Sequence, residues 1–237
     1  MKQVGIRGDP NLEILVPVVM ALDELCDSLV FVGGCAAGLL ITTERAQRVR
    51  PTKDVDVIAE VTSIKDYHAV ERLFETRGFQ HDVSEDAPIC RWIRDGILVD
   101  LMPSEKGVLD FHNRWYPLAI RSAERVRLPG GQEINLVSPP VFIASKIEAF
   151  KGRGNNDFLA SHDLEDVISV IDGRDELITE VNTSDKALKQ YIGEQLRGLL
   201  ETPAFQDALP GYLPGDSASQ ARFPELIEKL RLLAKTG

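Results

Sequence analysis

The chain has 237 residues, of which 43% are hydrophobic and 27% are charged, proportions that exclude a collagen-like, low-complexity or wholly disordered protein. Its formal net charge of −10 weighs against a protein that wraps a nucleic-acid backbone by bulk positive charge. Three cysteines are too few for a disulfide framework, and no apolar run reaches the roughly 18 residues of a membrane span, so we expect a soluble, cytoplasmic protein with no membrane partner.

The first third of the chain alternates helical and strand patterns. Apolar residues recur at helical spacing in the first segment, and the β-rich run that follows is stopped by Gly33 and Gly34. Farther on, acidic residues alternate with β-branched apolar ones, the pattern of a half-buried strand. The elements expected up to residue 76 are a helix over 11–28, a strand over 29–32, a helix over 36–48, a strand over 54–61 and a helix over 63–76.

Two β-hairpins are predicted next. Asp95-Gly96 separates the β-rich runs 89–94 and 96–102, and this dipeptide between apolar runs is a strong hairpin signal. A second turn, Pro129-Gly130-Gly131, joins the strand-like runs 124–128 and 133–137.

From residue 138 the composition becomes helical. Pro139 and Pro140 are expected to end the strands. Helices are expected over 141–151, 157–171, 184–202 and 223–235, with a loop over 203–216. We therefore predict two domains, an α+β domain over 1–137 and a helical domain over 138–237.

The strongest chemical signal is a set of carboxylates. Asp54 and Asp56 are two apart in a strand, so their side chains point to the same face and repel unless a cation lies between them. Asp100 lies inside an apolar strand, where a lone acid is costly unless it is paired or bound to metal. Carboxylates in this arrangement suit Mg²⁺. The alternative is that Asp54 and Asp56 are solvated acids on the exposed face of an edge strand.

Gly33 and Gly34 lie between a strand and a helix. Without Cβ atoms the backbone there can approach a phosphate, and the helix N-terminus adds favourable partial charge. The pair could also form only a tight turn. The G-x-G-x-x-G dinucleotide fingerprint and the Walker pattern are both absent.

Together these residues resemble the nucleotidyltransferase superfamily, whose signature is a Gly-Gly or Gly-Ser turn, a D-x-D strand and a later third Asp. Residues 50–57, RPTKDVDV, are similar to the R-x-T-x-D-x-D stretch of its AbiEii-like branch, which includes toxin components of abortive-infection and toxin–antitoxin systems. A second block, residues 146–153 followed by 161–166, is similar to the K-x-x-A…R…D-x-x-D-L segment of those proteins. The resemblance extends over residues 29–172.

The resemblance implies a fold and an activity. The fold would be α+β, a small mixed β-sheet core of the polymerase-beta-like kind flanked by helices and followed by a helical C-terminal region. The activity would be Mg²⁺-dependent transfer of a nucleoside monophosphate from an NTP to an acceptor hydroxyl. Asp54, Asp56 and Asp100 would hold two Mg²⁺ ions, and Asp100 is also a candidate to accept the attacking proton.

The same resemblance implies nucleotide-binding residues. Gly33 and Gly34 would contact phosphates, and Lys146 would reach the triphosphate. Asp163 would support this contact or the second substrate, and Arg153 is a further candidate for nucleotide binding. The alternative for Lys146 and Arg153 is a solvated basic face. Asp163 and Asp166 could instead simply pair with Arg153 or Lys151.

Several acceptors and partners remain open. The acceptor hydroxyl could belong to an RNA 3′ end such as that of tRNA, to a protein or to a small molecule, and a cognate antitoxin is a candidate partner. The basic residues Arg45, Arg48, Arg50 and Lys53 could meet an acceptor phosphate. The alternative functions are a non-catalytic nucleotide-sensing or partner-binding member of the same fold and, with less support, a metal-dependent phosphohydrolase.

Overall fold

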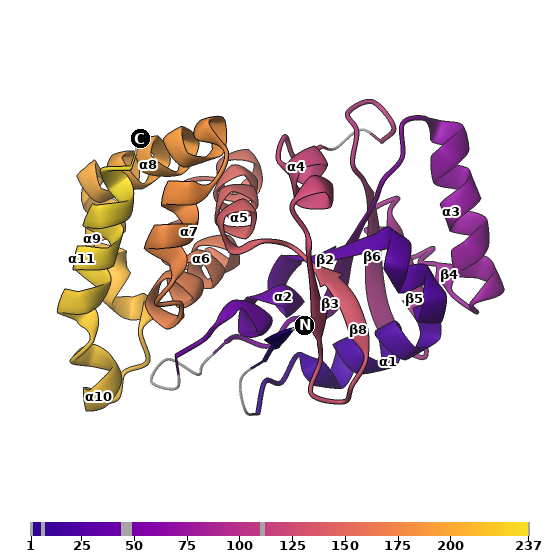
Figure 1. The fold of residues 1–237 in the computed structure, drawn as a ribbon, viewed down its shortest axis with the longest axis horizontal. Coiled ribbons are helices and arrows are strands. Elements are labelled where there is room, and N and C mark those ends of the chain that lie inside the picture. Colours follow the sequence, from indigo (N-terminus) through magenta and orange to yellow (C-terminus); the bar gives the residue numbers. More distant parts are fainter. Residues whose placement is uncertain (1, 6–7, 44–48, 110–111, 237) are drawn as a thin grey trace. The chain divides into compact units, whose positions relative to one another are not determined.

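The structure is a computed structural model that describes residues 2–5, 8–43, 49–109 and 112–236. The described chain divides into two compact units. The first combines Met1–Leu39 with Arg50–Ser138, and the second combines Leu40–Val49 with Pro139–Gly237. Figure 1 shows a sheet with flanking helices in the first unit and helices in the second, so the predicted fold class is confirmed.

The described residues of the first unit form an eight-stranded mixed sheet in the order β1-β7-β8-β2-β3-β6-β5-β4. In its centre β3 runs antiparallel to β2 and parallel to β6, and β6 runs antiparallel to β5. The strands are β1 (Lys2–Gln3), β2 (Leu29–Val32), β3 (Asp54–Ala59), β4 (Gln80–His81), β5 (Arg91–Arg94), β6 (Ile97–Pro103), β7 (Glu124–Arg127) and β8 (Glu133–Leu136).

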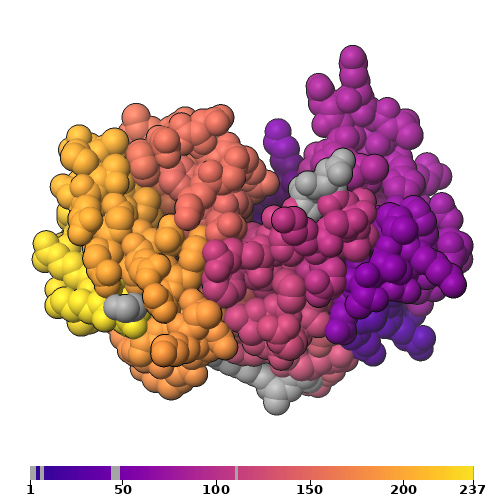
Figure 2. All heavy atoms as spheres, turned by 90° about the horizontal axis from the view of Figure 1, so that it is seen from above, coloured from indigo at the N-terminus to yellow at the C-terminus, as the bar shows by residue number. Residues whose placement is uncertain are grey.

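Helices accompany this sheet. They are α1 (Leu12–Leu22), the 3-10 helix η1 (Asp23–Ser28), α2 (Gly33–Leu40), α3 (Ile64–Thr76) and α4 (Tyr116–Arg121). Helix α1 packs against β3 and β6, while Phe74 of α3 contacts the fully buried Trp92 of β5 at 5.5 Å between ring centroids. The segment 82–90 between β4 and β5 projects from the surface of this unit, and its Val83 is 93% exposed (Figure 2).

Local sequence signals explain several boundaries. Ser63 caps α3 by accepting a hydrogen bond from the Asp66 backbone N–H. Asp95 and Gly96 have φ angles of 51° and 80° and form the two-residue turn of the predicted β5–β6 hairpin. In β3 the half-buried Asp54 and Asp56 alternate with buried valines, as predicted for a strand with two unlike faces.

The helix predicted over 36–48 is wrong at both ends. Helix α2 begins at Gly33 and ends at Leu40. Thr42 and Thr43 are not helical because their backbone N–H groups donate to the carbonyl of Gly173, at 2.9 and 3.0 Å. Residues 44–48 lie outside the described residues. The first helix is also shorter than the predicted 11–28, because α1 ends at Leu22 and a 3-10 helix follows.

The second unit is helical. Helix α5 packs against α6 and α8, and α8 packs against α11. Its helices are α5 (Pro139–Arg153), α6 (His162–Gly173), α7 (Leu177–Thr183), α8 (Lys186–Glu201), α9 (Pro203–Ala208), the 3-10 helix η3 (Leu209–Tyr212), α10 (Ser217–Gln220) and α11 (Phe223–Ala234). Among the helices that the structure describes, none has the length and apolar character to cross a bilayer.

Three boundaries in this unit differ from the prediction. Pro139 and Pro140 follow the last strand, as predicted, but they already form the first turn of α5, ahead of its predicted start at 141. Proline fits there because the N–H that it lacks has no helical partner at that position. Pro203 likewise begins α9 inside the predicted loop 203–216. Helix α6 begins at His162, not at 157, because Ser161 caps it by accepting from the Leu164 N–H.

Candidate active site

The three predicted acids lie together in the central sheet. Asp54 and Asp56 lie on β3 and Asp100 lies on β6, and the parallel register places Asp56 directly opposite Asp100. Residues opposite each other, and residues two apart on one strand, share a face of a sheet. The structure therefore brings all three carboxylates to one face, where the side chains of Asp54 and Asp100 are 28% and 12% exposed.

An arginine that the sequence analysis missed joins two of these acids. Arg91 lies opposite Asp100 on the antiparallel strand β5. Its Nε and Nη2 donate to Oδ1 and Oδ2 of Asp100, both at 2.8 Å, and Nη2 also donates to Oδ2 of Asp54 at 3.2 Å. The pKa of Arg91 is raised, first of all by its hydrogen bonds to Asp100. The predicted Asp95-Gly96 turn already contained this pairing, because a two-residue turn fixes which residues of the hairpin lie opposite each other.

Gly33 lies against the carboxylate of Asp56. Strands β2 and β3 are antiparallel with Val32 opposite Asp56, so the first residue of α2 follows directly beside this acid. A Cβ atom on Gly33 would lie only 1.7 Å from Oδ2 of Asp56, and Gly33 has a φ of +69° that side chains disfavour. Only glycine fits this position, and the glycine turn and the carboxylate cluster form one site.

The segment before β3 is held by two hydrogen-bonding side chains. Thr52 Oγ1 donates to Oδ1 of Asp54 at 2.7 Å. The buried Asn11 side chain donates to the Arg50 carbonyl at 3.1 Å and accepts from the Thr52 N–H at 2.8 Å. Gly34 packs beside the same segment, since a Cβ there would lie 3.0 Å from Arg50 and 3.2 Å from Thr52. Asn11 is far from Asp54 in the sequence, and no sequence signal pointed to it.

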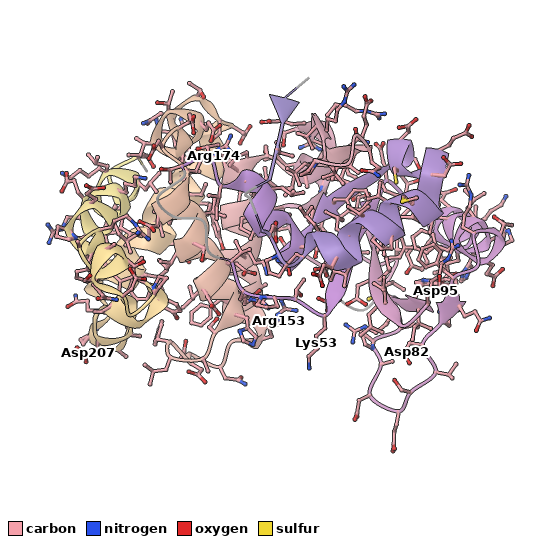
Figure 3. The ribbon with its side chains drawn as sticks, turned by 90° about the horizontal axis from the view of Figure 1, so that it is seen from below. Lys53, Asp82, Asp95, Arg153, Arg174 and Asp207 are labelled. Carbon is pink, nitrogen blue, oxygen red and sulfur yellow. The ribbon has the colours of Figure 1, made fainter. Side chains whose placement is uncertain are left out.

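The basic run predicted beside these acids is described only in part. Lys53 is exposed and its side chain points away from the ribbon (Figure 3), and Arg50 is half-buried next to Gly34. Arg45 and Arg48 lie outside the described residues.

The remaining predicted residues form a cluster in the second unit. Lys146 of α5 is almost fully buried, and its Nζ lies 3.1 Å from Oδ1 of Asp163 and 2.6 Å from Oδ2 of Asp166, both on α6. Arg153, at the end of α5, donates Nε and Nη2 to the two oxygens of Asp163, each at 3.0 Å. The pairing of Asp163 with Arg153, one of the two interpretations left open by the sequence, is therefore observed, whereas the ion pairs of Lys146 with both acids were not anticipated.

Electrostatics stabilise the ionised form of Asp163. Burial by itself would raise its pKa, but the hydrogen bonds and charges of Arg153 and Lys146 outweigh this effect, and the net shift is downward. Asp163 is therefore an ionised carboxylate at neutral pH, held between two cations.

The first-unit acids fit a divalent cation by their chemistry. Carboxylate oxygens from Asp54, Asp56 and Asp100 are the hard ligands that Mg²⁺ prefers. Over residues 2–5, 8–43, 49–109 and 112–236, no group of three or more His, Cys, Asp or Glu side chains is already arranged around a metal position. In this cluster the guanidinium of Arg91 supplies the positive charge between Asp54 and Asp100.

Comparisons with known proteins identify the fold. No protein-family model matches the sequence, and no curated protein matches it. Among solved structures, an antigenic nucleotidyltransferase-like protein from Paracoccidioides brasiliensis is similar with a TM-score of 0.50 and 20% identity, over 96% of this chain and 95% of that chain. The antibiotic-resistance factor ANT(2'')-Ia aligns with a TM-score of 0.40 and 17% identity, over 67% of this chain and 81% of that chain. The chain therefore shares the fold of a nucleotidyltransferase-like protein over nearly its whole length.

Proposed function

We propose that the protein is a Mg²⁺-dependent nucleotidyltransferase that moves a nucleoside monophosphate from an NTP to an acceptor hydroxyl. The observation that carries this proposal is the placement of Asp54, Asp56 and Asp100 on one sheet face, with the backbone of Gly33 against Asp56. A side-chain-free turn at a helix N-terminus next to three carboxylates suits a polyphosphate and its cations. The fold shared with a nucleotidyltransferase-like protein supports the same reaction class.

The proposed reaction is an in-line displacement at the α-phosphorus. The acceptor oxygen forms a bond to this phosphorus, the bond to the bridging oxygen breaks, and pyrophosphate leaves. Bound Mg²⁺ would neutralise charge on the phosphates and favour ionisation of the acceptor hydroxyl, with Asp54, Asp56 and Asp100 as its ligands. The hydroxyl proton would pass to Asp100, whose oxygens each keep a second lone pair beyond their bonds to Arg91.

Donor binding would use the glycine turn and a basic side chain. Gly33 and Gly34 would present backbone N–H groups to the phosphates. We also propose that Lys146 and Asp163 hold Arg153 in place for the donor. The Arg153 side chain is 72% exposed although two of its nitrogens bond to Asp163, so it can meet an anion. On this proposal an Arg153→Ala variant raises KM for the NTP more than it lowers kcat.

A labelling experiment tests the proposed reaction and identifies the class of acceptor. The purified protein is given Mg²⁺ and each of the four α-³²P-labelled NTPs, with total tRNA, the protein itself or an aminoglycoside mixture as acceptor. We expect transfer to one of these classes, and loss of transfer in an Asp54→Asn/Asp56→Asn variant. An Asp95→Asn variant is the matched control, because Asp95 is an exposed acid at a hairpin turn of the same sheet (Figure 3).

The same experiment also tests the toxin-type assignment and the two alternative functions, a nucleotide-sensing protein and a phosphohydrolase. Transfer to tRNA or protein supports the AbiEii-like, toxin-type assignment and motivates a search for an antitoxin. Binding of NTP without transfer to any acceptor contradicts the enzyme proposal and favours a nucleotide-sensing member of the fold. Acceptor-independent release of labelled nucleotide indicates a phosphohydrolase instead.

A further inference from the structure

Arg91 links two of the three acids of the proposed active site. Its guanidinium makes two hydrogen bonds of 2.8 Å to Asp100 and a third bond, of 3.2 Å, to Asp54. The atom that reaches Asp54 is Nη2, which also donates to Oδ2 of Asp100, so a single nitrogen bridges the two carboxylates. Arg91 therefore already places a positive charge between Asp54 and Asp100.

The strand fixes Arg91 on this face. Its neighbour Trp92 is fully buried and packs against Phe74 on the other side of β5. Because successive strand residues point to opposite faces, burial of Trp92 turns Arg91 toward the acids. A guanidinium stays protonated throughout the pH range of folded proteins, so this counter-charge is permanent.

The two links of Arg91 are unequal. The link to Asp100 is bidentate, whereas the link to Asp54 is one longer hydrogen bond. Asp54 is also held through its other oxygen by Thr52, at 2.7 Å, so it keeps its place when Arg91 withdraws. The bond to Asp54 is therefore the one that can open without disturbing Asp100.

We propose that Arg91 is a built-in counter-ion of the carboxylate cluster, which competes with the divalent cation and releases Asp54 when that cation binds. The inference rests on the proposed function, since it assigns the same acids to metal binding. Arg91 is in this sense a positioning residue that holds the acids together in the metal-free protein. It also lowers the affinity of the cluster for a metal, because a positive charge stands among the ligands.

The test uses Mn²⁺ alone as the probe, with free Mn²⁺ measured by electron paramagnetic resonance. The full chain is titrated as wild type, Arg91→Ala, Arg91→Gln and Arg91→Lys. Both neutral variants are expected to bind Mn²⁺ at least about tenfold more tightly than wild type, which corresponds to about 1.4 kcal/mol. Arg91→Lys keeps the charge and is expected to stay close to wild type. A merely structural role would not tighten binding.

A matched control lies on the same strand. Arg94 faces the other side of β5, where its guanidinium lies 5.6 Å from the Phe79 ring centroid and pairs with Asp95 at 3.4 Å. Arg94→Ala should leave Mn²⁺ affinity unchanged. In EDTA, Arg91→Ala should melt at a lower temperature than wild type, and Mn²⁺ should raise its melting temperature by more than it raises that of wild type.

The outcomes separate this inference from the proposed function. If Arg91→Ala and Arg91→Gln bind Mn²⁺ no more tightly than a wild type that transfers nucleotides, the counter-ion role is wrong and the function stands. If wild type and neutral variants all fail to bind Mn²⁺, both are wrong. If the competition takes place at Asp54, Arg91→Gln should tighten Mn²⁺ binding much less in an Asp54→Asn background than it does in wild type.

Discussion

A few single atoms hold the proposed active site in its shape. A Cβ on Gly33 would overlap the Asp56 carboxylate, and the Thr52 hydroxyl holds one oxygen of Asp54. These contacts fix Asp54 and Asp56 at the start of β3, although like charges at this spacing repel each other. Substitutions of Gly33 and Thr52 test these two contacts separately.

Gly33→Ala should destabilise the protein by about 2–5 kcal/mol, because it combines a positive φ with a clash against Asp56. Urea unfolding followed by circular dichroism measures this loss. Gly198→Ala in helix α8 is the matched control, since a Cβ there meets no atom within 4 Å and should stabilise the helix by about 0.5–1 kcal/mol. A Gly33→Ala protein as stable as wild type would show that the backbone around Asp56 is not as described.

Thr52→Val should impair the Mg²⁺ dependence of the reaction more than it lowers the stability of the protein. The substitution keeps the shape and removes the hydroxyl that donates to Asp54, so we expect a stability loss of about 1 kcal/mol and a higher Mg²⁺ concentration for half-maximal transfer. Thr52→Ser keeps the hydroxyl and should restore the wild-type Mg²⁺ dependence. Equal Mg²⁺ dependence in the valine and serine variants would argue against this positioning role.

Pairs of elements place the charged clusters of each unit. The β5–β6 hairpin brings Arg91 opposite Asp100, and the α5–α6 pair buries Lys146 between Asp163 and Asp166. An intact buried ion pair contributes little net stability, because its attraction mainly offsets the cost of removing both charges from water. Removing one partner is destabilising, because it leaves a buried charge without compensation. The α5–α6 cluster is therefore a sensitive test of the second unit.

Lys146→Met should cost about 3–5 kcal/mol at pH 7, because Asp163 and Asp166 are left buried without their ammonium partner. In wild type the lowered pKa of Asp163 gives stability that is present above its unfolded-state pKa and is lost as the pH falls through the lowered value. The variant lacks the part of this effect that Lys146 supplies, while Arg153 still bonds to Asp163, so its stability deficit should shrink as the pH is lowered from 7 to about 3. Urea unfolding at both pH values measures the difference.

The control for this experiment is on the same helix. Lys151→Met removes an α5 ammonium that lies 5.7 Å from the Tyr191 ring centroid, at an exposed position where the expected cost is below about 1 kcal/mol. A Lys146→Met deficit that is equally small, or that grows toward acid pH, would contradict the buried-pair account.

Elements whose signals are local were predictable from the sequence. The Ser63 cap and the Asp95-Gly96 turn act within a few residues of the boundaries that they set. The end of α2 was not predictable, because Thr42 and Thr43 bond to Gly173, which is remote in the sequence. The helical turns inside 203–216 were missed because proline signals either the start of a helix or a break.

At the scale of the whole molecule, the chain shares its fold with a protein of low sequence identity. The nucleotidyltransferase-like structure is only 20% identical yet aligns over 96% of the chain. The grouping of the three acids could be predicted because D-x-D spacing and an acid inside an apolar strand are patterns of the sequence itself. Arg91 was missed although the predicted turn implied that it lies opposite Asp100, whereas Asn11 was missed because its role depends on a contact between distant segments.

The proposed reaction moves the α-phosphoryl group together with its nucleoside, and the position of a radioactive label distinguishes it from other transfers of phosphate. Wild type and the Asp54→Asn/Asp56→Asn variant are compared on the productive acceptor with NTP labelled at the α or at the γ phosphorus. We expect wild type to move α label to the acceptor and to release γ label in pyrophosphate, and we expect the variant to do neither. Transfer of γ label to the acceptor, or α-label transfer that survives in the variant, would contradict it.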